Sequence, residues 1–181
     1  DILFLKRILP MLQNAYKYIV RYLENVITFK KTKTFDLWEN YVGESVFGIS
    51  AVFASLKTMS EIYEIVKDTY KENRLKVEQI NKEIQKINPL LVDVKEWIHM
   101  NMYSNEKQAY VNDVENPKID ISALSLVTPF NIFTVNEKKM INTYMAIEMN
   151  LRTYTGGYLR YENDNYLGRK KSMEFIKSLD G

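Results

Sequence analysis

Hydrophobic residues recur at helical spacing in the first part of the chain. Residues 8–25 carry apolar side chains three or four positions apart, at Ile8, Leu12, Ala15, Ile19 and Leu23. Residues 46–66 repeat the pattern at Ile49, Val52, Phe53, Leu56, Met59, Tyr63 and Val66. Because such positions share one face of a helix, the pattern predicts helices over both ranges, with Pro10 in the first turn of the first. The second is apolar over a wide arc, as expected of a helix that packs against neighbours on two sides.

The middle of the chain predicts a charged helix and then a break in the helical period. Residues 71–88 favour a helix that Pro89 should kink or end, because proline lacks a backbone N–H and clashes with the preceding turn. Residues 90–100 are expected to continue as another helical piece. Residues 101–122 show no helical period, and their Tyr and Val content predicts a short irregular hairpin.

Two further helices are expected toward the C-terminus. Residues 122–130 predict a short buried helix that stops before Pro129. Thr134 and Glu137 have the spacing of a capping box, so the last helix is expected to open there and to end at Gly156-Gly157. The pattern therefore indicates an all-α chain of about five helices. A plain helical bundle is the simplest arrangement, and the wide apolar arc also suits a layered helical barrel.

Composition narrows the classes of function. Of 181 residues, 46% are hydrophobic and 27% charged, which indicates one globular unit rather than a disordered segment. Basic residues exceed acidic ones by only two (25 against 23), so nothing favours a nucleic-acid partner. Cysteine is absent and His99 is the single histidine, which excludes disulfides and metal sites built from cysteine or several histidines. No metal and no cofactor is expected.

The sequence also bears on location. No apolar run approaches the ~20 residues of a membrane span, so no membrane partner is expected. No signal peptide is seen, which favours the cytoplasm. The chain begins with Asp1 rather than methionine, which indicates a piece of a longer protein.

One stretch carries candidate chemistry. FDLWENYVGESVFG, residues 35–48, surrounds Glu39 with aromatic residues, namely Phe35, Trp38, Tyr41 and Phe47. An apolar neighbourhood disfavours the charged form of a carboxylic acid, so these rings offer a means of keeping Glu39 protonated near neutral pH. A solvated surface glutamate beside a core tryptophan is the alternative.

Two segments resemble a known family. DLWENYVGESVFGISAVFASL, residues 36–56, resembles the catalytic-acid segment of the glucoamylases, glycoside hydrolase family 15. Residues 120–168 resemble that family's run from an Asp-Ala-Ser-type helix to an Arg-Tyr-x-x-Asp-x-Tyr loop. Two matches in the family's order are specific, whereas a lone Trp-Glu pair would not be. The resemblance implies an (α/α)₆ barrel, of which residues 1–181 form a single fragment from the middle of the catalytic domain.

The resemblance also implies an activity, the inverting release of glucose from the non-reducing ends of α-1,4-glucans. In that chemistry a carboxylic acid protonates the glycosidic oxygen while a second carboxylate activates water on the opposite face of the sugar. Glu39 aligns with the general acid, Asp36 with a supporting acidic residue, and Trp38 with a ring that stacks on the sugar. The family's base and an earlier substrate-binding motif have no counterpart here, so residues 1–181 alone are expected to hydrolyse no glucan.

A second loop is expected to bind the substrate. Arg160, Asp164 and Tyr166 match the family's substrate-binding residues, since a guanidinium donates to paired sugar hydroxyls and a carboxylate accepts from them. A structural Arg160–Asp164 pair that holds the loop is the alternative. Asn40 departs from the family, many of whose members carry a second glutamate there. The sequence after Gly168 departs from the family pattern as well.

Three functions stay open at this point. The chain is part of a glucoamylase, part of a trehalase or another α-glucosidase of that family, or a non-catalytic helical interaction module that keeps the motif without a complete site. The expected partners are an α-glucan or oligosaccharide substrate and the remainder of the catalytic domain. Self-association is the other expectation, since apolar helices such as 46–66 would expose surface if alone.

Overall fold

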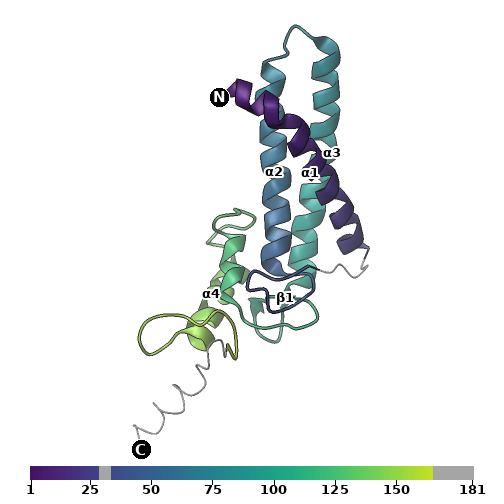
Figure 1. The fold of residues 1–181 in the computed structure, drawn as a ribbon. Coiled ribbons are helices and arrows are strands. Elements are labelled where there is room, and N and C mark those ends of the chain that lie inside the picture. The colour runs from purple at the N-terminus through teal and green to yellow at the C-terminus, as the bar shows by residue number, and fades with distance from the viewer. Residues whose placement is uncertain (29–33, 165–181) are drawn as a thin grey trace, which may run out of the picture.

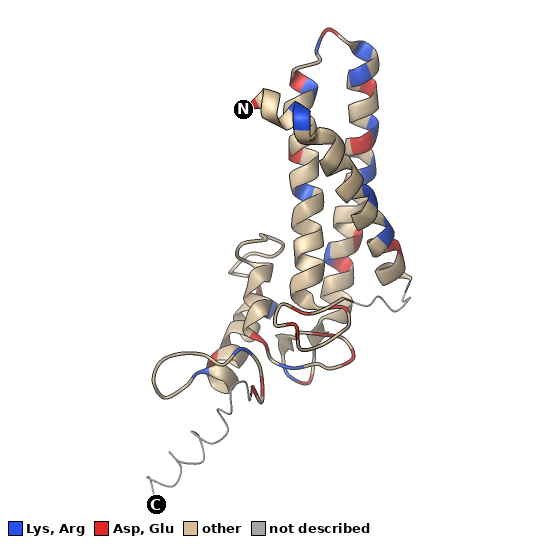
Figure 2. Ribbon diagram, viewed as in Figure 1, with Lys and Arg blue, Asp and Glu red and all other residues tan. Residues whose placement is uncertain are grey.

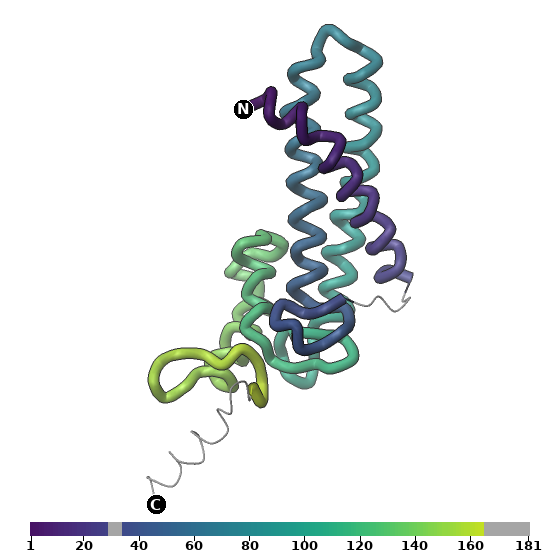
Figure 3. Tube along the Cα trace, viewed as in Figure 1, coloured from purple at the N-terminus to yellow at the C-terminus, as the bar shows by residue number. Residues whose placement is uncertain are grey.

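The computed structural model describes residues 1–28 and 34–164, and its longest elements are three helices that pack together (Figure 1). They are α1 (Ile2–Ile27), α2 (Val46–Asp68) and α3 (Arg74–Asn101). A short turn joins α2 to α3, which run antiparallel, and α1 crosses this pair obliquely (Figure 3). The all-α class predicted from the sequence is confirmed, because the described residues hold five helical elements and one two-stranded sheet.

Each long helix begins at a polar cap. The side chain of Asp1 accepts hydrogen bonds from the first turn of α1. The hydroxyl of Ser45 accepts from the backbone N–H of Gly48 at 3.0 Å, and Asn73 accepts from Lys76 at 3.1 Å. Caps of this kind satisfy backbone N–H groups that have no partner within the helix.

The core of the bundle consists of the apolar positions that predicted its helices. Leu23 of α1, Leu56 of α2 and Ile87 of α3 are all buried in one cluster. Of the predicted stripe along α2, every member except Val52 is buried, and Val52 packs against the edge of the cluster. The wide apolar arc therefore reflects contacts with both α1 and α3.

The helices run through both prolines. α1 begins at Ile2 rather than at residue 8, so Pro10 lies inside it and not in its first turn. α3 continues through Pro89 as one helix, so the prediction that it ends there is wrong. A proline inside a helix costs about 3 kcal/mol. Burying Ile87 and Val94, on either side of Pro89, contributes roughly 1.5–3 kcal/mol each, which offsets that cost.

Shorter elements gather at the end of the bundle where α2 begins. The predicted hairpin is present, with β1 (Tyr103–Ser104) antiparallel to β2 (Ala109–Tyr110). The predicted short helix is the 3₁₀ helix η1 (Ile121–Leu126), most of whose side chains are buried. The last helix, α4 (Lys138–Leu151), packs against η1 and β2.

Both ends of α4 differ from the prediction. The carboxylate of Glu137 accepts from the backbone N–H of Thr134 at 2.9 Å, but the helix begins only after Glu137. The helix ends before Arg152, which instead pairs with Tyr158 in an isolated antiparallel bridge. Gly156, at φ 86°, turns the chain between them, in a left-handed conformation that glycine adopts without strain.

Backbone and side-chain contacts tie this end of the molecule together. The backbone N–H of Tyr110 donates to the hydroxyl of Thr143 on α4 at 3.0 Å. The first N–H of α2, from Val46, donates to the carbonyl of Asn112 at 2.8 Å. A small second core joins the hairpin to α4 through Ala109, Ile119, Ala146, Ile147 and Leu151. These contacts fix the loops that carry the candidate site.

Lys and Arg are interspersed with Asp and Glu along the long helices (Figure 2). Within residues 1–28 and 34–164, no helix combines the length and apolarity needed to cross a membrane. The long helices and the shorter elements form an elongated arrangement (Figure 1). Closure into an (α/α)₆ barrel stays a prediction, because it needs more helical hairpins than the described residues supply.

We predict that Ile87→Ala lowers the free energy of unfolding by about 2–5 kcal/mol, because it empties a fully buried position between the helices. Chemical unfolding followed by circular dichroism measures the change. Leu75→Ala is the control on the same helix, since Leu75 is 73% exposed, and should change stability by no more than about 0.5 kcal/mol. Equal effects of the two substitutions would contradict the packing of α3.

Candidate functional site

The segment that carries Glu39 forms a narrow loop before α2. Phe35 pairs with Val42 in an antiparallel bridge, and the N–H of Gly43 donates to the carbonyl of Thr34 at 2.9 Å. The side chain of Asp36 accepts from the backbone N–H groups of Asn40 at 2.8 Å and Tyr41 at 3.2 Å. Asp36 is 8% exposed, so a buried carboxylate holds the tip of the loop, residues 37–40, in one conformation.

Glu39 stands at this tip in a left-handed conformation, with φ 56°. Its backbone N–H donates to the carbonyl of Asp36 at 3.2 Å, which closes the turn. The side chain of Glu39 is exposed, and so is that of Phe35. The expectation that the neighbouring rings enclose Glu39 is therefore not met by the described residues. The rings point elsewhere, since Phe47 packs against Phe130 and the Trp38 side chain reaches Asp120.

Trp38 connects the loop to η1. Its indole N–H donates to both carboxylate oxygens of Asp120, at 3.2 and 3.0 Å. Asp120 is 1% exposed and caps η1 by accepting from the backbone N–H of Ser122 at 2.7 Å. Burial raises the pKa of Asp120, and the hydrogen bonds from Ser122 and Trp38 oppose that rise.

Arg160 belongs to the second predicted loop and reaches from it to Trp38. Its guanidinium is 5.5 Å from the ring centre of Trp38 and 5.1 Å from that of Tyr161. Nε and Nη2 of Arg160 donate to the carboxylate of Asp164, at 3.0 and 2.8 Å. The Asp164 side chain is only 1% exposed. This planar, two-bond geometry is the structural pair weighed as the alternative from the sequence.

The second loop is fixed to the segment that carries Asp120. The N–H of Ile121 donates to the carbonyl of Arg160 at 2.9 Å, and the N–H of Glu162 to that of Ile119 at 3.0 Å. The Glu162 carboxylate accepts from the Ile119 N–H at 2.9 Å and pairs with the Lys107 ammonium at 2.8 Å. Glu162, to which the sequence assigned no role, thus anchors the loop.

Tyr161 links the tips of the two loops. Its hydroxyl accepts from the amide of Asn40 at 2.8 Å, and its ring meets that of Tyr41 edge to face at 5.9 Å. The ammonium of Lys118 lies over both rings, 4.4 and 5.3 Å from their centres. Burial raises the pKa of Tyr161, which keeps its hydroxyl protonated.

The structure therefore brings together five of the six residues predicted for the site: Asp36, Trp38, Glu39, Arg160 and Asp164. Tyr166 and the departure after Gly168 lie outside the described residues. Sequence reasoning missed Asp120, Lys118 and Tyr161. A polar residue just before a short buried helix is a capping signal that could have singled out Asp120.

Among residues 1–28 and 34–164, no three His, Cys, Asp or Glu side chains gather in a way that could hold a metal ion. Instead, N–H donors contact two carboxylates of the site: the loop backbone donates to Oδ1 of Asp36, and Trp38 and Ser122 donate to Asp120. The second oxygen of Asp36, Oδ2, is buried and has no hydrogen-bond partner among the described residues. Trp38, Arg160, Tyr161 and Asp164 form a fixed platform of rings and paired charges. One exposed carboxylate, that of Glu39, projects from it.

Comparison with known proteins gives one informative similarity. The chain is 29% identical over 168 residues to a curated protein of Methanocaldococcus jannaschii that is named an uncharacterized glycosyl hydrolase. The match covers 91% of this chain and 24% of that relative, so the chain spans about a quarter of the relative's length. No family model matches the chain.

We predict that Asp120 makes stability depend on pH. Its pKa is raised in the folded state above the ordinary value of 3.8, so the native protein holds that proton more tightly than the unfolded chain does. The stabilisation is present below pH 3.8 and is lost as the pH rises through the raised pKa. Asp120→Asn lacks this titrating group and therefore shows no such loss. The stability of the wild type relative to the variant should fall between pH 3.8 and the raised pKa, the titration window, and then level off. Chemical unfolding at a series of pH values measures it.

Two further variants sharpen this test. Trp38→Phe removes a hydrogen bond that favours the ionised carboxylate, so the window should extend to higher pH. Asp93→Asn, an exposed carboxylate on α3, should follow the wild-type profile. Parallel profiles for the wild type and Asp120→Asn would show that Asp120 is not the titrating group.

Proposed function

We propose that the chain is the acid-bearing part of a glycoside hydrolase. The observation that carries the proposal is that two segments far apart in the sequence are in contact in the fold. Trp38 of the first segment donates to Asp120 of the second and lies beside Arg160. Residues 36–56 and 120–168 were each singled out from the sequence by the same resemblance. The relative named a glycosyl hydrolase, which matches 91% of the chain, supports the same class of function.

In finer detail, we propose an inverting enzyme of the glucoamylase type that releases glucose from the non-reducing ends of α-1,4-glucans. Glu39 is the general acid that protonates the glycosidic oxygen. Inversion needs a second carboxylate, roughly 6.5–9.5 Å away, to activate water on the opposite face of the sugar. We assign that base to a segment outside residues 1–181, in line with the expectation that this chain alone hydrolyses no glucan.

The described residues supply positioning for this chemistry. Asp36 holds the backbone on both sides of Glu39, which limits the directions that its carboxyl can take. Arg160 lies over the ring of Trp38, so a sugar would stack on the other face of that ring. Fixed geometry of this kind lowers the entropy cost of reaching the transition state.

The exposure of Glu39 sets a requirement on the proposal. A carboxylic acid stays protonated near neutral pH only where water is scarce or charges oppose its ionisation. Since Glu39 is exposed among the described residues, the bound sugar or a further segment has to cover it before it can donate its proton. Substrate binding would then create the acid that the reaction uses.

We predict that Glu39→Gln, in the natural protein that contains residues 1–181, lowers kcat on maltose by roughly 10²–10⁴. Glutamine keeps the shape of the side chain and lacks the transferable proton. Glu106→Gln is the matched control, because Glu106 is an exposed glutamate in the β1–β2 turn at the same end of the molecule. A fall of less than tenfold, or an equal fall in the control, would remove Glu39 from the mechanism.

The substrate range is tested in the same assay. Glucose release from maltose and starch but not from trehalose fits the glucoamylase type. Release from trehalose alone would favour the trehalase alternative. The absence of any release by the natural protein would favour the non-catalytic helical module.

For Arg160→Lys we expect a loss of stability of about 1–3 kcal/mol, because lysine cannot donate two parallel hydrogen bonds to the buried carboxylate of Asp164. Arg152→Lys is the control, since its pair with Glu148 is at the surface, where solvent screens it, and the substitution should leave stability nearly unchanged. Unchanged stability together with a lower kcat/KM would instead assign Arg160 to substrate binding.

A further inference from the structure

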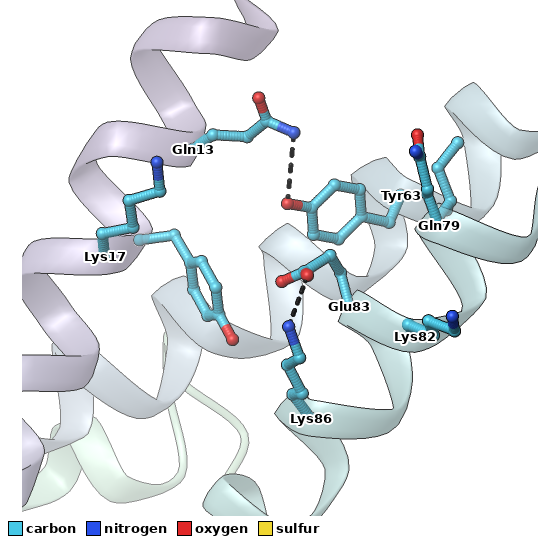
Figure 4. A pocket seen from close by; sticks show the side chains of 9 residues that line it. Gln13, Lys17, Tyr63, Gln79, Lys82, Glu83 and Lys86 are labelled. Carbon is cyan, nitrogen blue, oxygen red and sulfur yellow. Dashed lines mark hydrogen bonds and ion pairs between the residues drawn. The ribbon is translucent and has the colours of Figure 1, made fainter. Parts of the chain in front are cut away.

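A cavity of about 410 Å³ lies between the three long helices (Figure 4). Gln13 and Tyr16 come from α1, Tyr63 from α2, and Glu83 and Lys86 from α3. The N-terminus of α2 lies beside the loops of the candidate site, and Tyr63 is about 25 Å further along that helix, at roughly 1.5 Å of rise per residue. The cavity is therefore a separate feature of the molecule.

Two tyrosine hydroxyls line the cavity. Tyr16 and Tyr63 are 8% and 2% exposed. Within the described part of the chain the Tyr16 hydroxyl makes no hydrogen bond, and the Tyr63 hydroxyl accepts one from the amide of Gln13 at 3.4 Å. Burial raises the pKa of both, so both keep their protons and can donate. Both tyrosines line the cavity, so a ligand bound there could accept from their hydroxyls and donate to them.

The rest of the lining mixes donors and acceptors. The carboxylate of Glu83 lies next to Tyr63 and pairs with the ammonium of Lys86 at 2.6 Å (Figure 4). In the same view Lys82 extends away from Tyr63, so its charge is turned from the centre of the cavity. Lys17 lines the cavity as well and lies beside Gln13 (Figure 4), so an anion would meet the carboxylate of Glu83 together with ammonium groups. A hydrocarbon would leave the hydroxyls and amides unpaired. A neutral ligand with several hydroxyls matches these groups, since a hydroxyl both donates and accepts.

We propose that this cavity binds a neutral saccharide unit. Its volume falls within the range of about 300–1,000 Å³ that is typical of small-molecule sites. The two tyrosine rings offer apolar surface for the C–H groups of a sugar, and the polar side chains offer partners for its hydroxyls. The cavity and its lining carry this inference, and only the choice of maltose as the probe rests on the proposed function.

The test is a titration of ¹⁵N-labelled protein with maltose, followed by NMR. Backbone amide signals of residues 13–17 and 79–86 should shift together and give one dissociation constant. Tyr63→Phe keeps the ring and removes the hydroxyl, and should weaken binding roughly three- to tenfold, the effect of one lost hydrogen bond. Tyr18→Phe, at an exposed tyrosine of α1, should leave binding unchanged.

A second variant controls for the case in which Tyr63→Phe weakens binding by disturbing the fold. Glu83 lines the cavity and its side chain is 33% exposed, so Glu83→Gln should preserve the packing while it weakens maltose binding and admits inorganic phosphate. Phosphate binding by the wild-type protein in place of maltose, at the same ionic strength, would overturn the saccharide proposal. Maltose binding that Tyr63→Phe leaves unchanged would overturn it as well. An unchanged kcat in Glu39→Gln would not affect these binding titrations. The proposed function and the proposed saccharide site can therefore be refuted independently.

Discussion

The buried carboxylate of Asp120 is the point to which the candidate site is tied. It accepts from the indole of Trp38 and from the first turn of η1, and its backbone pairs with Tyr161. One residue thus joins the loop that carries Glu39, the 3₁₀ helix and the loop that carries Arg160. A buried charge is costly unless donors surround it. That requirement explains why a tryptophan, whose ring is apolar and whose N–H donates, stands in front of Asp120.

Charge and aromatic surface alternate through the rest of the platform. The guanidinium of Arg160 lies against the rings of Trp38 and Tyr161 and pairs with Asp164, while the ammonium of Lys118 also lies over the ring of Tyr161. Cations over ring faces are attracted by the ring electrons, and the attraction grows where water is excluded. The platform is therefore rigid, and Glu39 is the group that projects from it into solvent. The described residues supply orientation, and the covering of Glu39 is left to substrate or to other segments.

The polar cavity belongs to a different part of the bundle. α2 carries Ser45 as its cap at the candidate site and Tyr63 at the cavity, with a continuous buried stripe between them. A helix held on two sides by α1 and α3 separates the two places rigidly. A sugar bound at the cavity would keep a glucan near the protein without occupying the loop of Glu39, which would raise the local concentration of chain ends.

The sequence by itself determined the all-α class, the helical character of the three long segments, the short hairpin and the buried stripe of α2, because helical periodicity and caps act over a few residues. It also singled out the two segments of the candidate site. Only the tertiary structure decided that Pro89 lies within one helix, since burial of its neighbours outweighs the local preference. The same holds for the bond from Trp38 to Asp120, which joins positions 82 residues apart, and for the exposure of Glu39. Tyr63 belonged to a core stripe in the sequence, and its place at a polar cavity depends on which side chains α1 and α3 bring opposite it. A local pattern records which face of a helix is buried, whereas the partner on that face is set by how distant segments pack.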